Sequence, residues 1–124
     1  MAQHVFGWAS ILAGVLSGLY MGVRFQREDW LGGYNAFPRR MVRLAHVALV
    51  ALGMLNVLFA QTRPALNLNP LLLGVASWAL IVAAVLMPAC CLWVAHGRRH
   101  FEVFAAPIAC LVTGLVLTIG GLLR

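Results

Sequence analysis

Histidines and arginines are the residues of this sequence whose types and spacing could do chemistry. His46 stands three residues after Arg43, and His96 stands two residues before Arg98. Both histidines lie at the edges of apolar runs, so helices that rise about 1.5 Å per residue would place them at matching depth. Two imidazoles at one depth on different helices could ligate a haem iron from both faces. The sequence therefore predicts a haem b site with His46 and His96 as the metal ligands.

Charged side chains beside these histidines fit the same hypothesis, because guanidinium groups pair well with carboxylates such as the haem propionates. His100 could replace His96 as the second ligand. Gly53 follows His46 by two helical turns, where the absence of a side chain would let a flat macrocycle approach. The residues predicted to hold the cofactor are His46, His96, His100, Arg39, Arg43 and Arg98.

Other interpretations of these residues stay open. A histidine within one turn of a membrane surface can reach water or headgroups. The arginines could hold an anionic lipid such as cardiolipin, and the same region could border a quinone. Asn56, ten residues after His46, would then either bond to a neighbouring helix or line a quinone cavity. No sequence motif decides among these alternatives.

The helices that carry these residues are predicted from the composition and from the apolar segments of the sequence. Of 124 residues, 63% are hydrophobic and 10% are charged, which is typical of a membrane protein. Four apolar segments, about 5–23, 41–60, 71–95 and 103–123, are each long enough to cross a bilayer. Their short connections favour antiparallel neighbours. We therefore predict a single all-α domain over residues 1–124, an integral membrane four-helix up-down-up-down bundle.

The charge distribution predicts how this bundle is oriented. The net charge of +6 comes from nine arginines and no lysine against three acids. Seven of the arginines fall in the first and third connections, which predicts that these connections are cytoplasmic and both termini periplasmic. Arginines placed between apolar runs argue against nucleic-acid binding. The arginine-only, alanine- and leucine-rich composition indicates a bacterial chain, so we expect a multi-pass protein of the bacterial cytoplasmic (inner) membrane.

Several residues predict where the helices begin and end. Pro38 suits the first turn of the second helix, where its missing N–H would be unpaired anyway. Asn69 before Pro70 fits the cap of the third helix, and Gly97 fits its end. Pro88 should kink the third helix in mid-span.

Small residues recur every four positions in the first and fourth segments. Membrane helices associate by close packing, which small residues permit. The two stripes therefore predict helix contacts, either within the chain or with another subunit. The residues predicted to pack are Ser10, Gly14, Gly18 and Gly22 in the first segment and Cys110, Gly114 and Thr118 in the fourth.

The expected function follows from what the segments contain. No Asp or Glu lies in any apolar segment, which argues against proton- or cation-coupled transport. The sequence has no catalytic motif of a known kind, so we do not expect an enzyme. The arrangement is similar to the haem-carrying membrane anchors of bacterial respiratory dehydrogenases, although it shares no motif with them. We expect a small subunit of a larger respiratory or electron-transfer complex, holding haem b or bordering a quinone site near the cytoplasmic face. The alternative is a cofactor-free structural or assembly subunit that packs against partner membrane helices and lipids.

Overall fold

Four long α-helices make up most of the computed structural model, which describes residues 1–97 and 100–124. All four are long and apolar enough to cross a membrane, which confirms the predicted all-helical class and the four candidate spans. Short 3-10 helices lie in the connections. The helices are α1 (Ala2–Arg24), α2 (Phe37–Thr62), α3 (Pro70–Ala95) and α4 (Ala105–Leu122), with η1 (Trp30–Gly32), η2 (Arg63–Ala65) and η3 (Phe101–Phe104) between them.

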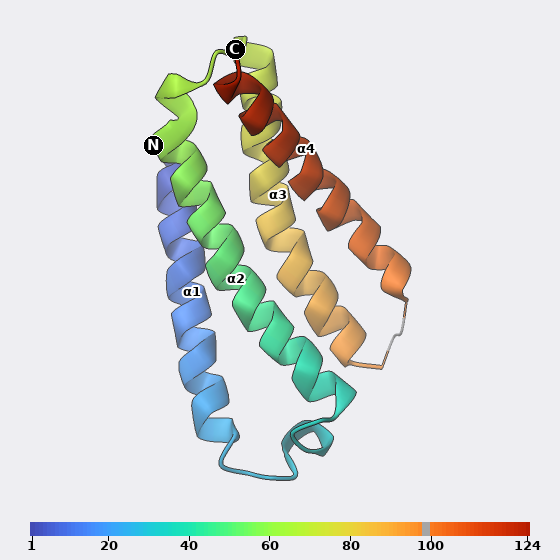
Figure 1. Cartoon of the computed structure of the whole chain (residues 1–124). Helices are drawn as coiled ribbons and strands as arrows, with labels where there is room; N and C mark the ends of the chain where they lie inside the picture. Colours follow the sequence, from blue (N-terminus) through green and yellow to red (C-terminus); the bar gives the residue numbers. More distant parts are fainter. Residues whose placement is uncertain (98–99) are drawn as a thin grey trace.

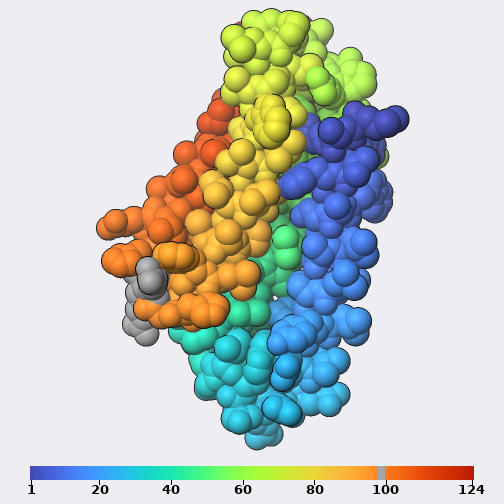
Figure 2. All heavy atoms as spheres, turned by 180° about the vertical axis from the view of Figure 1, so that it is seen from behind, coloured from blue at the N-terminus to red at the C-terminus, as the bar shows by residue number. Residues whose placement is uncertain are grey.

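The helices pack mainly on their neighbours in sequence. Extensive contacts join α1 to α2, α2 to α3, and α3 to α4, with a smaller contact between α1 and α3. Figure 1 shows both chain ends and the α2–α3 connection at one end of the molecule, and the α1–α2 connection at the other. Seen from behind, the side chains of α3 stand between those of α1 and α4 (Figure 2). Much of the surface of α1 and α4 therefore has no helix of this chain against it.

The helix boundaries have the local causes that the sequence predicts. The Asn69 side chain caps α3, because its Oδ1 accepts a hydrogen bond of 2.8 Å from the Leu72 amide. Pro70 is the first residue of α3, and Gly97, with φ of 92°, follows its end. Pro38 is the second residue of α2. Around Pro88, α3 continues as one helix.

Many large apolar side chains of the helices face outward, while alanines and glycines lie at the helix contacts. On α3, Ala76 and Ala83 are fully buried, whereas Trp78 is 68% exposed and Val85 is 52% exposed. A protein in water would bury the larger apolar groups, because their transfer from water contributes most to stability. Lipid removes that preference and leaves close packing of small residues as the main source of helix association. The burial pattern therefore agrees with a membrane protein.

Candidate functional site

His46 on α2 faces α1. Its Nδ1 lies 2.8 Å from the Gly14 carbonyl oxygen and 3.0 Å from Ser17 Oγ. The Ser17 hydroxyl itself donates to the Gly14 oxygen at 2.7 Å. Because a carbonyl can only accept, His46 Nδ1 is the donor in its contact with the Gly14 oxygen. The imidazole thus joins α2 to α1 through its Nδ1.

A glycine makes space for this ring. A β-carbon added to Gly18 would lie 2.7 Å from Cε1 of His46 and 3.3 Å from each ring nitrogen. Seven residues further along α2, Gly53 lies against α1 as well, where an added β-carbon would be 2.9 Å from the Gly7 carbonyl oxygen. The face of α2 on which Gly53 was expected to admit a macrocycle is therefore covered by α1.

The other two histidines have different surroundings. His96 caps the C-terminal end of α3, is exposed, and has Nδ1 2.8 Å from the Leu92 carbonyl oxygen of its own helix. His100 is exposed at the start of η3. His46 therefore packs on α1, whereas His96 turns back on α3. Arg98, the third predicted propionate partner, lies outside the described residues.

Arg39, in the first turn of α2, is buried beneath the α1–α2 connection, with 3% of its surface exposed. Its guanidinium carbon lies 4.4 Å from the centre of the Phe25 ring and 5.7 Å from those of both Trp30 and Tyr34. Its Nη atoms donate to the carbonyl oxygens of Phe25, at 3.4 Å, and of Glu28, at 3.5 Å, while its buried Nε has no partner. Cation–π attraction compensates for part of the charge burial. We call Arg39, Phe25, Trp30 and Tyr34 the Arg39 cage.

Arg43 packs on the same connection. Its Nη2 donates to the Tyr34 carbonyl oxygen at 3.4 Å, and its guanidinium lies 4.6 Å from the centre of the Tyr34 ring. Arg39 and Arg43 therefore hold the α1–α2 connection onto the start of α2. Arg40, between them in sequence, is exposed. Trp30 and Tyr34 form two walls of the Arg39 cage.

Residues of the first small-residue stripe differ in what they touch. Ser10 Oγ donates to the Leu49 carbonyl oxygen of α2 at 2.8 Å. Gly14 lies against Val50, and Gly18 lies against His46. An added β-carbon at Gly22 would meet no atom within 4 Å. The first three stripe positions thus face α2. Gly7 also faces α2, opposite Gly53, and the sequence did not indicate that contact.

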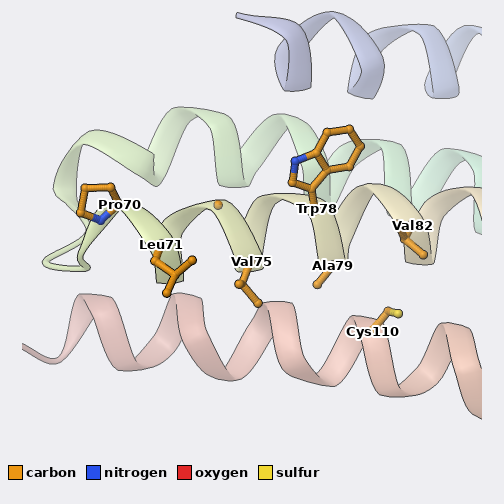
Figure 3. A pocket seen from close by; sticks show the side chains of 8 residues that line it. Pro70, Leu71, Val75, Trp78, Ala79, Val82 and Cys110 are labelled. Carbon is orange, nitrogen blue, oxygen red and sulfur yellow. The ribbon is translucent and has the colours of Figure 1, made fainter.

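In the second stripe, Gly114 lies against α3. A β-carbon there would come within 2.7 Å of the Leu80 side chain. Thr118 donates to the Gly114 carbonyl oxygen at 2.7 Å and so bonds within its own helix. Cys110 borders an apolar groove of about 530 Å³ between α3 and α4, where Leu71 and Val75 form part of the opposite wall (Figure 3).

A polar network joins three helices near the chain ends. Gln3 Nε2 donates to Asn56 Oδ1 at 3.0 Å, and the Ser77 hydroxyl donates to Gln3 Oε1 at 2.6 Å. Asn56 Nδ2 donates to the carbonyl oxygens of Leu52, at 2.9 Å, and of Leu80, at 3.2 Å. Asn56 therefore bonds to a neighbouring helix, one of the two predicted roles. Gln3 was missed because the first span was expected to begin at residue 5. Ser77 lies inside the predicted third span, where no pattern singled it out.

Within residues 1–97 and 100–124, no three His, Cys, Asp or Glu side chains gather as metal ligands. Comparisons with protein-family models, curated proteins and solved structures find no match for this chain. The buried side chains of Gln3 and Asn56 bond to each other, and many large apolar side chains are exposed on the helices.

Proposed function

We propose that this chain is a cofactor-free structural or assembly subunit of a larger complex in the bacterial inner membrane. In this proposal the helices cross the membrane up-down-up-down, with both termini on the periplasmic side. The chain has no catalytic activity of its own. It acts through the apolar outer surfaces of its helices, which pack against partner membrane helices and lipids.

One observation carries the proposal: the polar side chains within the helices are used to hold the chain together. Gln3, Asn56 and Ser77 satisfy one another, and His46 bonds to α1. Electron transfer through haem b has less support, because His46 and His96 face different neighbours and α1 covers Gly53. The arginines expected at the propionates, Arg39 and Arg43, are engaged by aromatic rings.

Photocrosslinking in native membranes tests the structural role. A photoreactive residue in place of Val116, which is 60% exposed on α4, should give one crosslinked polypeptide of fixed mass. The same residue at Ala83, which is fully buried on α3, should give no crosslink to another chain. Migration of the untagged protein as a particle no larger than its own 13.5 kDa chain and bound lipid would contradict a subunit role.

An optical spectrum of the same purified material tests the absence of a cofactor. We expect the reduced-minus-oxidised difference spectrum to lack b-type bands, even from cells supplied with haem. A b-type spectrum that disappears in His46→Ala and persists in His4→Ala would instead establish haem ligation and end the cofactor-free proposal.

Labelling of a single cysteine tests the proposed orientation. In a variant without Cys90, Cys91 and Cys110, a cysteine at Asn35 lies in the exposed α1–α2 connection. A membrane-impermeant maleimide should modify it in inverted vesicles and leave it unmodified in spheroplasts, because arginine-rich connections stay in the cytoplasm. Modification in spheroplasts would reverse the orientation.

A further inference from the structure

An apolar groove opens where α2, α3 and η3 meet. Its volume is about 390 Å³, within the range of roughly 300–1,000 Å³ that is usual for ligand clefts. Every side chain that lines it is apolar. The walls include Leu44, Val47 and Ala51 of α2, Met87 of α3, and Phe101 and Phe104 of η3. Such a groove fits a hydrocarbon chain.

A cation stands at one end of this groove. Arg40, Leu44, Val47 and Ala51 follow one another at intervals of four, three and four residues, so they share one face of α2. Arg40 is therefore in line with this wall, one turn before Leu44 and directly before Met41, which also lines the groove. Arg40 lies in the first turn of α2, next to the α1–α2 connection, so it is at the arginine-rich end of the span.

Arg40 is also the arginine of this group that is available to a ligand. Arg39 is buried in its cage, and Arg43 stacks on Tyr34. Arg40 is exposed, and in the described part of the chain its guanidinium has no carboxylate partner. Its N–H donors are free to bind oxygen atoms in the fork geometry that suits a phosphate group.

We propose that the groove is a binding site for an anionic phospholipid, with one acyl chain against the α2 wall and the headgroup phosphate on Arg40. The apolar groove suits the acyl chain of such a lipid, and the Arg40 guanidinium suits its phosphate. Arg39 and Arg43, each within one turn of Arg40, add positive potential that favours a net negative headgroup over a zwitterionic one. A free phosphate would obtain one exposed guanidinium and none of the apolar contact. The proposed lipid site is formed by residues of this chain alone, so it does not depend on the proposed subunit role.

Native mass spectrometry of the full-length protein in detergent can test the site. The probes are dioleoyl phosphatidylglycerol and dioleoyl phosphatidylcholine, which have the same acyl chains and differ in headgroup charge. Wild-type protein should retain phosphatidylglycerol in preference. Arg40→Gln should weaken phosphatidylglycerol binding about fivefold, the effect of one basic residue near a membrane surface, and leave phosphatidylcholine binding unchanged. Ala51→Leu should weaken binding of both lipids because it fills the groove.

Two matched variants serve as controls. Arg63→Gln removes an equal charge from η2, and Ala13→Leu adds the same side chain to an exposed position of α1. Neither should change lipid binding. Equal losses in Arg40→Gln and Arg63→Gln would mean that net charge alone attracts the lipid, and would overturn the proposal. Effective competition by glycerophosphoglycerol, which has no acyl chains, would do so as well, because it would show a phosphate site without the groove. Circular dichroism checks that each variant is folded. Ala51→Met fills the groove with a more flexible side chain and should also weaken binding of both lipids.

Discussion

Replacing Gly53 with leucine should lower the stability of the folded protein sharply, because α1 leaves no space for a side chain there. A β-carbon at this position would lie 2.9 Å from the Gly7 carbonyl oxygen and 3.0 Å from the Ile11 amide nitrogen. Both are backbone atoms, which cannot rotate away as a side chain can. The helices would have to separate, with loss of their other contacts. We expect a cost at the upper end of the range of about 1–3 kcal/mol that is typical of overpacking.

Thermal unfolding of the detergent-purified protein, followed by circular dichroism, measures this effect. Gly22→Leu is the matched control, because a β-carbon at Gly22 meets no atom within 4 Å. It should leave the midpoint unchanged or raise it slightly, since leucine favours a helix over glycine by up to about 1 kcal/mol. Similar unfolding of the two variants would show that the α1–α2 contact does not hold the protein together.

These two glycines also show what could be predicted about helix packing. The four-residue spacing correctly places Ser10 and Gly14 on one face of α1, because residues four apart lie one above the other. Spacing does not say where that face meets its neighbour or where the neighbour ends. Gly22 shares the spacing and lies beyond the contact. Gly7 is three residues from Ser10 and so falls outside a strict four-residue pattern, although an added β-carbon there would meet backbone atoms of α2 at 2.9 Å.

The four spans were predictable for a simple reason: length and apolar content decide whether a segment can cross a bilayer. Their ends were predicted within a few residues, and caps such as Asn69 were predictable from residue type alone. The start of α1 at Ala2 was not, because Gln3 and His4 lower the hydropathy there. The predicted start at residue 5 therefore left out Gln3, whose buried side chain bonds to Asn56 and Ser77.

The histidines show the limit of reasoning from depth. His46 is the tenth residue of α2, whereas His96 follows the last residue of α3. Position along a helix also does not fix the direction around its axis. His46 faces α1 together with Gly53, as their separation of seven residues requires. His96 is at a helix end, where it bonds to its own backbone. A similar limit applies to Arg39, because no local pattern indicates that three aromatic rings of the α1–α2 connection fold around it.

Replacing Asn56 with leucine should have the second large effect. The change removes the nearer of two acceptors of the Gln3 amide, which donates to Asn56 Oδ1 at 3.0 Å and to the Ser77 carbonyl oxygen at 3.4 Å. Both the Gln3 and the Asn56 side chains are at least 95% buried. Water cannot replace the lost partner inside the membrane. Leaving a buried polar group unsatisfied costs about 1–3 kcal/mol, so we expect a loss of that size in thermal or denaturant unfolding. Thr113→Val should cost little, because that exposed hydroxyl bonds within its own helix.

A double-mutant cycle separates this network from general packing. Gln3→Met removes the other polar group, so the combined variant Gln3→Met/Asn56→Leu leaves no amide of this pair without a partner. It should be more stable than the sum of the single losses predicts, by about 1 kcal/mol, a value typical of hydrogen bonds between membrane helices. Strictly additive losses would mean that the two side chains act independently. A coupling of this size would show that hydrogen bonds set the register of α1 against α2 at the end of the molecule where the chain begins. The glycine contacts would then set the separation of the two helices.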